Sequence, residues 1–403
     1  MLHELKLHFI FAAYMQYIQN HIRTILGTYD GSLPLSHYLR AYFKKNPVLG
    51  SRDRKMLTEM TYVFYRCAKG LPRELSMDQQ VQYALLLADS ELAPIRRFLP
   101  DALQELYGLS FEHNAGILAD QGIRFDPEAL FPYEVPVSKG ISKGEWLASL
   151  LQRPLLFIRV VPQYLPDVKA VLEREAISFE QVTPFCLSLP NGTAVEKIIP
   201  AKMYRIQDAS SQQTGNYFNM TNDDRCWDCC CGAGGKSLLL KDCAPNAPLL
   251  VSDVRASILD NLSERFRLYG YPAPERIRLS VSDTVETSRL LGDRSFDHII
   301  ADVPCTGSGT WARTPEQLYF FDPANLAAYS DRQKAITTNA IRFLKPGGTF
   351  FYITCSVFCA ENEEVVQHIL DHTTGLFLQQ KTLINGSAKG ADSMFIAVFS
   401  KTV

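Results

Sequence analysis

Two short motifs late in the chain each hold a cysteine beside groups that can take part in acid–base chemistry. Residues 302–309 have the sequence DVPCTGSG, and the RTPE of residues 313–316 follows. Residues 354–356 have the sequence TCS and lead into the ENE of residues 361–363. A single free cysteine is most often a small buried hydrophobic residue. Two cysteines in motifs of this kind within one domain predict a site of thiol chemistry.

A thiolate can add to carbon 6 of a cytosine, and the resulting adduct makes carbon 5 nucleophilic enough to accept a methyl group. A base must then remove the proton from carbon 5 so that the cysteine can leave. Asp302 lies two residues before Pro304 and is placed to contact the ring near N3, provided that it is protonated or shares a proton with N3. A cysteine at a strand end near cations could have the low pKa that a nucleophile requires. We therefore predict a catalytic group of Cys355, Cys305 and Asp302.

A glycine-rich segment, residues 228–236 (DCCCGAGGK), follows an expected strand and begins an expected helix. The pattern fails as a P-loop because Cys230 stands where the first glycine is required, and it fails as a dinucleotide fingerprint because Ser237 replaces the third glycine. S-adenosylmethionine (SAM) needs a tight turn beside a carboxylate for its amino group, and Asp228 fits that task. A tight turn that binds no ligand stays open as the alternative.

Further carboxylates follow the next strands. Asp253 is spaced to accept hydrogen bonds from ribose hydroxyls, and Asp283 could meet an adenine amino group. The expected cofactor-binding residues are Asp228, Cys230, Cys231, Gly232, Ala233, Gly234, Gly235, Lys236, Asp253, Asp283 and Asp302.

The ten cysteines do not indicate a disulfide scaffold or a metal site. The chain has no basic, apolar and small-residue pattern of a signal peptide and no apolar run near the roughly 20 residues of a membrane span. We therefore expect a cytoplasmic protein with reduced thiols. Cys229, Cys230 and Cys231 are contiguous and lack the C-x-x-C spacing of zinc ligands. We expect structural roles for Cys359 and, as buried residues, for Cys226 and Cys243.

Alternating strands and helices from residue 201 onward predict a mainly parallel sheet covered by helices on both faces. Expected strands are 225–229, 248–253, 277–281, 296–303, 348–354 and 394–400, and expected helices include 256–269 and 326–343. Ligands of such sheets bind beyond the carboxyl ends of the strands. Asp228, Asp253, Asp302 and Cys355 all fall at such ends.

The first 200 residues differ from this pattern. Residues 1–130 have helical periodicity, with Ser51 as an expected N-cap and Met56, Met60, Val63 and Phe64 on one apolar face. Residues 131–200 are rich in proline and include an expected strand at 155–161 and helix at 167–175, which predict a small α/β domain. The formal net charge of −2 does not indicate nucleic-acid binding, so any RNA-binding surface must be a basic patch on one part of the protein.

The two cysteine motifs and the glycine-rich segment resemble those of the RsmB/NOL1/NOP2/Sun family of RNA cytosine-C5 methyltransferases. The segment departs from the family at Cys231, Gly232 and Ala233, where Ala-Ala-Pro is usual, but it keeps small residues and both following glycines. The resemblance implies SAM as cofactor, Cys355 as the nucleophile and Cys305 as the cysteine that assists product release. DNA cytosine methyltransferases instead use the Pro-Cys cysteine, so the resemblance favours RNA.

The N-terminal half resembles the bacterial 16S rRNA branch of this family, on residues 51–54 (SRDR) with Glu59 and Tyr62 and on residues 153–160 (RPLLFIRV). The implied architecture is an all-α NusB-like RNA-binding domain (1–130), a small RRM-like α/β domain (131–200) and a Rossmann-like catalytic domain with a seven-stranded sheet (201–403). We expect a monomer that acts on RNA, with rRNA as substrate and no metal or membrane. The alternatives are a tRNA or DNA cytosine methyltransferase, or a SAM-binding assembly factor without catalysis.

Overall fold

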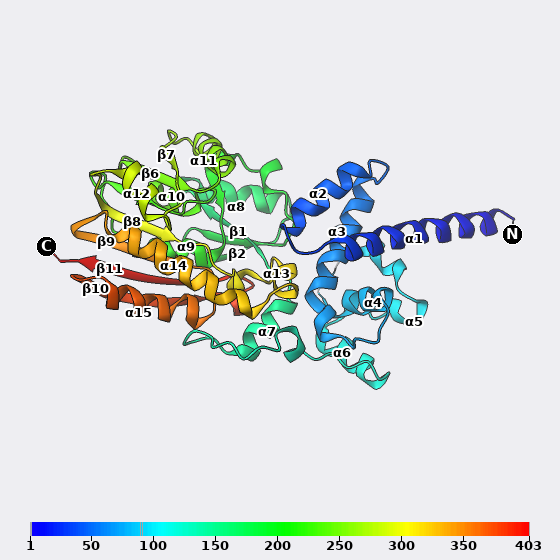
Figure 1. Cartoon of the computed structure of the whole chain (residues 1–403). Helices are drawn as coiled ribbons and strands as arrows, with labels where there is room; N and C mark the ends of the chain where they lie inside the picture. The colour runs from blue at the N-terminus through cyan, green and yellow to red at the C-terminus, as the bar shows by residue number, and fades with distance from the viewer. Residues whose placement is uncertain (1, 89, 91, 403) are drawn as a thin grey trace. The chain divides into compact units, whose positions relative to one another are not determined.

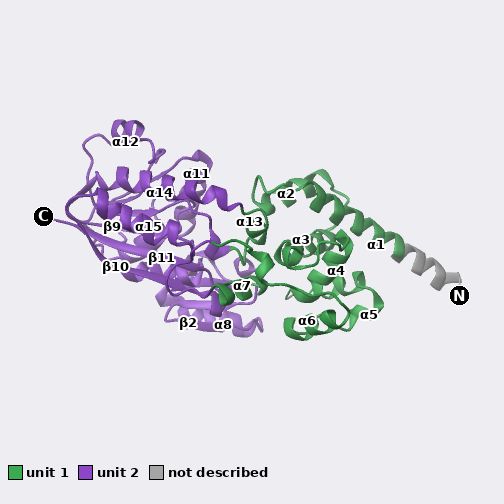
Figure 2. Cartoon of the chain, turned by 60° about the horizontal axis from the view of Figure 1, so that its bottom comes forward, with its two compact units in different colours: residues 1–134, 143–153, 311–321 green, residues 135–142, 154–310, 322–403 purple. Residues whose placement is uncertain are grey.

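The computed structural model of the chain describes residues 2–88, 90 and 92–402, with side chains from residue 12 onward (Figure 1). It contains two compact units. Unit 1 comprises residues 1–134, 143–153 and 311–321, and unit 2 comprises residues 135–142, 154–310 and 322–403 (Figure 2). The division into three domains at residues 130 and 200 stays a proposal.

Unit 1 is helical, as expected for the first part of the chain. Its helices are α1 (Leu2–Thr28), α2 (Leu35–Lys45), α3 (Ser51–Cys67), α4 (Met77–Leu87), α5 (Asp101–Gln104), α6 (Phe111–Asp120), α7 (Lys143–Leu151) and α13 (Pro315–Tyr319).

Helix α3 supplies much of the core of unit 1. The predicted apolar face is confirmed, because Met56, Met60, Val63 and Phe64 are all at most 5% exposed. The prediction that Ser51 caps this helix is wrong. The N-cap is Gly50, whose backbone N–H donates to Oδ2 of Asp53 at 3.0 Å. A carboxylate three residues into a helix satisfies this amide better than the hydroxyl of Ser51, which is already part of the first turn.

A segment from the second half of the chain completes unit 1. Residues 311–321, which include α13, follow the first cysteine motif in sequence. The guanidinium of Arg66 donates to the carbonyl of Ala312 at 2.9 Å, and the ammonium of Lys69 donates to that of Leu318 at 3.2 Å. Glu316 is buried here, and burial raises the pKa of its carboxyl. Residues 313–316 (RTPE) therefore belong to the helical unit 1 and not to the sheet.

Unit 2 begins with a small antiparallel sheet of order β2-β3-β1-β4. The strands are β1 (Leu156–Val160), β2 (Glu180–Thr183), β3 (Cys186–Leu189) and β4 (Tyr204–Ile206), with helices α8 (Leu165–Arg174) and α9 (Ala209–Gln213). The strand and helix expected at 155–161 and 167–175 are confirmed as β1 and α8. Arg159 of β1 and Arg205 of β4 both form ion pairs with Asp242, which joins the small sheet to the rest of unit 2.

The second sheet of unit 2 has seven strands in the order β10-β11-β9-β8-β5-β6-β7, and all pair in parallel except β11 with its two neighbours. The strands are β5 (Cys226–Asp228), β6 (Leu249–Asp253), β7 (Glu275–Arg278), β8 (Phe296–Asp302), β9 (Leu344–Thr354), β10 (Leu376–Asn385) and β11 (Ser393–Lys401). The predicted fold class is confirmed. β7 ends three residues before the expected end of that strand.

Helices cover both faces of this sheet and bury its apolar side chains. The helices are α10 (Gly235–Cys243), α11 (Ala256–Leu268), α12 (Thr284–Leu291), α14 (Leu326–Ile341) and α15 (Glu363–His372). Residues of α10 and α11 pack into one core cluster with Val251 and Ile300, and residues of α12, α14 and α15 pack into another with Trp227 and Ile299. Burial on both faces explains why the central strands are nearly continuous apolar runs. In the part of the chain that the structure describes, no helix is long and apolar enough to span a membrane.

Candidate functional site

The carboxyl ends of four adjacent strands bring the predicted residues to one edge of the large sheet. In the order β9-β8-β5-β6, these strands end at Thr354, Asp302, Asp228 and Asp253. Cys355 follows directly after β9. Because the strands are parallel, side chains 25 to 127 residues apart in sequence come together at the edge where such sheets bind ligands.

The glycine-rich segment forms the tight turn between β5 and α10. Gly232 has φ 50° and Gly234 has φ 83°, the left-handed region that glycine adopts without strain. A Cβ on Gly234 would also come within 2.9 Å of the side chain of Leu262 on α11. The backbone N–H of Gly232 donates to Oδ2 of Asp253 at 3.2 Å, so this turn lies against the end of β6.

Asp228 lies beneath this turn and is fully buried. The hydroxyl of Ser237 donates to its Oδ2 at 2.5 Å, whereas its Oδ1 is buried without a hydrogen-bond partner. Burial raises the pKa of Asp228 to about 7, and the nearby charge of Asp302 adds to this effect. An orphaned carboxylate oxygen beside a glycine turn is suited to accept a hydrogen bond from an ammonium group.

Asp253 has more partners than the sequence indicated. Its two oxygens accept hydrogen bonds from the backbone N–H of Arg255 (2.9 Å), from Nε and Nη2 of the Arg255 side chain (3.0 and 3.1 Å) and from Gly232. A carboxylate has about four lone-pair positions. A ribose that binds Asp253 must therefore displace the side chain of Arg255, which is 60% exposed. This competition was not predicted from the sequence, although Arg255 is only two residues away.

Asp283 is exposed and caps helix α12. Its Oδ1 accepts the backbone N–H of Glu286 at 2.9 Å. This N-cap role fixes the carboxylate at the start of α12, which is compatible with the adenine contact expected from the sequence. The contact itself stays a prediction.

Lys236 links the glycine turn to the predicted catalytic carboxylate. Its Nζ lies 3.2 Å from Oδ2 of Asp302 and donates to the hydroxyl of Ser211 at 2.8 Å. The Lys236 side chain is only 4% exposed, whereas that of Asp302 is 33% exposed. Asp302 therefore remains accessible to a ligand while a buried cation lies directly behind it. Lys236 was predicted only as a cofactor contact, and its pairing with Asp302 was not anticipated from the sequence.

The two predicted catalytic cysteines are in contact. Their Sγ atoms lie 3.3 Å apart, although the residues are 50 positions apart in sequence. The hydrogen bond with Cys355, followed by burial, raises the pKa of Cys305 well above its ordinary value. Cys305 therefore holds its proton at neutral pH and can donate it in the hydrogen bond to the sulfur of Cys355.

The remaining cysteines lie outside this pair. Burial raises the pKa of Cys229 and of Cys231, which makes both thiols poor nucleophiles. Cys230 is partly exposed in the turn. The thiol of Cys359 donates to the carbonyl of Val137 at 3.0 Å. Cys226 is buried as predicted, but the prediction for Cys243 is wrong: it is exposed, because it ends α10 where the helix leaves the sheet.

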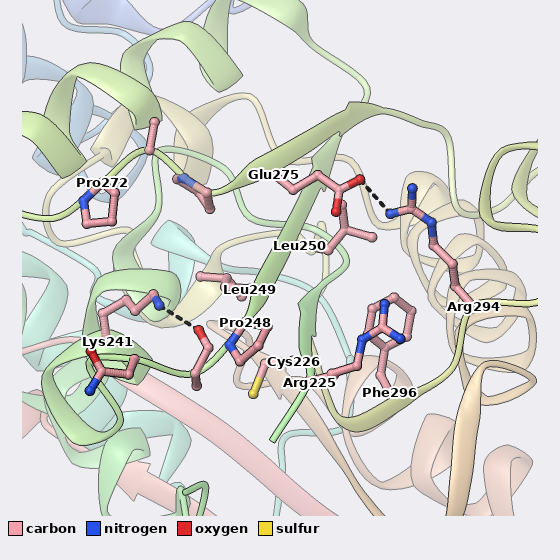
Figure 3. Close-up of a pocket in the computed structure, with 14 residues that line it drawn as sticks. Arg225, Cys226, Lys241, Pro248, Leu249, Leu250, Pro272, Glu275, Arg294 and Phe296 are labelled. Atoms are coloured by element: carbon pink, nitrogen blue, oxygen red, sulfur yellow. Dashed lines mark hydrogen bonds and ion pairs between the residues drawn. The ribbon is translucent and has the colours of Figure 1, made fainter. Parts of the chain in front are cut away.

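A pocket of about 330 Å³ lies at the opposite edge of the sheet, around the start of β5 and β6 (Figure 3). Three of its four charged side chains already have partners: Arg294 pairs with Glu275 at 2.6 Å, and Lys241 donates to the carbonyl of Ala247 at 2.6 Å. The pocket contains none of the predicted site residues, so it is not the candidate active site.

Comparison with protein-family models gives a match of residues 216–399 to the family described as 16S rRNA methyltransferase RsmB/F. Among curated proteins, the ribosomal RNA small subunit methyltransferase B of Enterobacter sp. (strain 638) is 29% identical over 174 residues, which are 43% of this chain and 40% of that protein. The protein of the same name from Klebsiella pneumoniae (strain 342) is 29% identical over 42% of this chain and 38% of its own length. The match thus spans about 40% of the length of these relatives.

Solved structures share the fold at lower identity. The crystal structure of PH0851 has a TM-score of 0.68 at 18% identity and covers 91% of this chain and 95% of its own. NSun6 from Pyrococcus horikoshii, solved with SFG, has a TM-score of 0.55 at 15% identity and covers 64% of this chain and 94% of its own. The matched region contains the glycine turn, Lys236, Asp302 and both cysteines of the contact pair. Through residues 216–399, the chain is similar to the RsmB/F methyltransferase family.

Proposed function

We propose that the protein transfers a methyl group from SAM to carbon 5 of a cytosine in RNA, with 16S rRNA as the substrate. The observation that carries this proposal is the contact between the thiols of Cys305 and Cys355, next to the Lys236–Asp302 pair. A methyl transfer to a nucleophilic oxygen or nitrogen has no need of a thiol. A transfer to carbon 5 of cytosine needs one thiol to form the adduct and a second group to assist its release.

The raised pKa of Cys305 supports different roles for the two cysteines, with Cys355 as the nucleophile and Cys305 as the group that assists release. The hydrogen bond with Cys355 and burial raise the pKa of Cys305, so we assign Cys305 the protonated role and give the attack to Cys355, the cysteine of the TCS motif. The bond formed is between the sulfur of Cys355 and carbon 6, and carbon 5 then accepts the methyl group. A base then takes the carbon 5 proton, the electrons of that C–H bond re-form the double bond between carbons 5 and 6, and the sulfur of Cys355 leaves as a thiolate, which restores the cytosine. Cys305 lies in contact with the reacting sulfur and is placed to assist this last step.

Asp302 and Lys236 are proposed to hold the cytosine ring. The carboxylate of Asp302 faces the ligand side, and the buried ammonium of Lys236 lies behind it. A proton shared between this carboxylate and N3 would stabilise the negative charge that develops in the adduct. The ammonium keeps the carboxylate oriented and neutralises its charge when no ring is bound.

The residues present fit SAM, which supplies an activated methyl group on a sulfonium. The unpartnered Oδ1 of Asp228 is suited to the amino group, Asp253 to the ribose hydroxyls and Asp283 to the adenine. The glycine turn lets the backbone approach the ligand closely. The remaining predicted contacts, from Cys230 through Lys236, belong to this same turn.

A basic surface on unit 1 supports an RNA substrate. Five exposed cations lie on α2 and at the start of α3, and we call them the basic corner: Arg40, Lys44, Lys45, Arg52 and Lys55. None of these five forms an ion pair in the described part of the chain. A cation in the first turn of a helix opposes the helix dipole, so the placement of Arg52 at the start of α3 is better explained by a role in binding anions than by one in helix stability. Phosphate contacts of this kind provide affinity for RNA rather than sequence selection.

The choice of 16S rRNA rests on the names of the matched family and relatives. Both catalytic thiols must stay reduced, which is the condition of the cytoplasm, and we place the reaction there.

The test uses purified protein, labelled SAM and three substrates: 16S rRNA transcripts, tRNA and DNA. We expect methyl transfer to cytosine C5 of the rRNA, no transfer by Cys355→Ala with SAM binding retained, and a covalent protein–RNA adduct with Cys305→Ala. Full activity of Cys355→Ala contradicts the assignment. If Cys355→Ala traps the adduct instead and the protein prefers DNA, the protein is a DNA cytosine methyltransferase. If the wild-type protein prefers tRNA, the substrate is tRNA rather than 16S rRNA. Binding of SAM and RNA without transfer supports an assembly factor.

A further inference from the structure

A fully buried carboxylate lies between the two cysteine loops. Glu361 is 0% exposed and follows β9 in a short turn before α15. Its Oε1 accepts hydrogen bonds from the backbone N–H of Thr306 at 2.8 Å and from Nε2 of Gln333 at 2.9 Å. Its Oε2 accepts from the hydroxyls of Thr306 and Ser356, both at 2.5 Å. The carboxylate therefore has four donors.

Two of these partners are the direct neighbours of the reactive thiols. Thr306 follows Cys305 and Ser356 follows Cys355. One carboxylate group thus connects the backbone and hydroxyl of Thr306 in the Cys305 loop to the hydroxyl of Ser356 in the Cys355 loop. Each reactive cysteine is therefore one peptide unit from a neighbour that Glu361 anchors.

Other contacts hold Glu361 itself in place. The hydroxyl of Tyr352 donates to the carbonyl of Glu361 at 2.5 Å and to Oε1 of Gln333 at 3.2 Å. The amide of Gln333 also donates to the carbonyl of Pro304 at 2.9 Å, on the other side of Cys305. A buried carboxylate is costly unless its hydrogen-bonding positions are filled, and here four donors fill them. A neutral isostere cannot match this set of donors, because one of its two polar atoms is itself a donor.

We propose that Glu361 is a positioning residue that holds the sulfur atoms of Cys305 and Cys355 in contact. This proposal has two parts. The geometric part, that Glu361 keeps the two sulfurs in contact, concerns the free protein. The catalytic part, that this contact speeds release of the product, rests on the proposed function. Glu361 does not touch the cytosine; it acts through Thr306 and Ser356. Without its charge, the thiol of Cys305 no longer lies against the sulfur of Cys355. Release of the methylated product then slows more than the formation of the adduct.

The geometric part is tested by disulfide formation. Diamide takes two electrons and two protons from a pair of thiols, joins the sulfurs and becomes the corresponding hydrazine. Sulfurs 3.3 Å apart need to approach by little more than 1 Å to reach the disulfide length of about 2.05 Å. We expect a rapid Cys305–Cys355 disulfide in the wild-type protein, identified by mass spectrometry of linked peptides. Glu361→Gln is expected to slow it by about tenfold, because the charged hydrogen bonds that hold the two loops are weakened.

Glu364→Gln is the matched control, since this glutamate is exposed on α15, outside the network around Glu361. It should form the disulfide at the wild-type rate. If Glu361→Gln melts at the assay temperature, Thr306→Val replaces it: the variant keeps the shape of the side chain but removes one donor to Oε2. A wild-type rate of disulfide formation in a folded Glu361→Gln or Thr306→Val protein overturns the proposal.

The catalytic part is tested in the same variants with RNA and SAM. We expect Glu361→Gln to lower kcat with KM for both substrates unchanged, and to accumulate covalent protein–RNA adduct during turnover. A purely structural role would lower the amount of active enzyme without changing the fraction held as adduct, and that result contradicts the catalytic part. If the wild-type protein methylates no RNA, the proposed function fails, whereas the disulfide rates still decide the geometric part.

Discussion

The ammonium of Lys236 lies 3.2 Å from the carboxylate of Asp302, which joins the start of helix α10 to the end of strand β8. The two residues come from two separate sequence motifs, one predicted to bind the cofactor and one to perform catalysis. A buried cation beside a carboxylate that is one-third exposed connects the two halves of the candidate site. Changes to the cofactor turn should therefore affect the cytosine end as well.

The pairing of Lys236 with Asp302 predicts that mutations of the two residues have non-additive effects on activity. We expect Lys236→Met and Asp302→Asn each to lower kcat/KM for RNA methylation by about 100-fold or more, the usual range when an acid–base or charge-stabilising group is removed. The double variant should be little worse than either single variant, because both remove the same unit. Rates of labelled methyl transfer complete the double-mutant cycle. Lys345→Met is the control, since Lys345 forms a 2.8 Å pair with Asp297 at the opposite end of β8. Multiplicative losses would show that Lys236 and Asp302 act independently.

The raised pKa of Asp228 predicts a pH dependence of SAM binding. Burial moves this pKa from an ordinary 3.8 to about 7, and only the ionised carboxylate attracts the amino group of SAM. The affinity for SAM should therefore rise as the pH increases through about 7. It should fall again above about 8, where an α-amino group loses its proton. Calorimetric titration between pH 5.5 and 9 measures both limbs. Asp228→Asn should bind more weakly and lose the rising limb, and a rising limb that survives this substitution contradicts the assignment.

The same group affects the stability of the free protein. The folded chain keeps a proton on Asp228 between pH 3.8 and about 7, whereas the unfolded chain has released it. Its contribution to the free energy of unfolding is therefore largest below pH 3.8 and is lost as the pH rises to about 7. The difference in Tm between the wild-type protein and Asp228→Asn should shift in favour of the variant over this interval. A pH-independent difference would show that the carboxylate does not titrate there.

The basic corner predicts a change in the salt dependence of RNA binding. We expect the combined variant Lys44→Gln, Lys45→Gln, Arg52→Gln and Lys55→Gln to bind RNA more weakly at low salt. Its plot of log affinity against log salt concentration should be shallower by about 0.7 to 0.9 for each phosphate that the variant no longer neutralises. The control carries the same charge change on exposed residues of unit 2: Arg267→Gln, Arg289→Gln, Lys381→Gln and Lys389→Gln. An equal reduction of affinity in both variants would mean that only the net charge matters.

The parts of the fold that could be predicted from the sequence are those with a local signal. Asp228, Asp253 and Asp302 each end a mainly apolar strand, and a parallel sheet brings such ends to one edge. Strand β10 was not predicted, because its middle is the polar and mostly exposed sequence QQK at the sheet edge. An edge strand has only one neighbour and can carry such residues, so it lacks the apolar run that marks β8.

Contacts between residues that are far apart in the sequence could not be predicted from the sequence. Glu361 was recognised as part of the ENE motif, but no role could be assigned to it. Its partners Thr306 and Gln333 are 55 and 28 residues away in sequence. The pairing of Asp253 with Arg255 was different: the two residues are close enough in sequence for the competition to have been anticipated. The exposure of Cys243 depends on where α10 leaves the core, which residue type alone does not determine.

Gly309 offers a test of how tightly the two cysteine loops pack. Its backbone N–H donates to the carbonyl of Cys355 at 2.9 Å, and an added Cβ would lie 3.0 Å from that carbonyl oxygen and 2.3 Å from the carbonyl oxygen of Ser393. Both neighbours are backbone atoms of the central strands or their ends, so they cannot rotate away as a flexible side chain would. Gly309→Ala should therefore lower stability by about 1 to 3 kcal/mol and displace Cys355 from Cys305.

The control for Gly309→Ala is Gly116→Ala within helix α6, where an added Cβ meets nothing within 4 Å. This change should leave methyl transfer unaltered and raise stability by about 0.5 to 1 kcal/mol, because alanine loses less conformational freedom in a helix than glycine. Thermal unfolding and the rate of Cys305–Cys355 disulfide formation measure the two effects. If Gly309→Ala keeps both the Tm and the disulfide rate of the wild-type protein, the loops are not closely packed, and the sulfur contact does not depend on their fit.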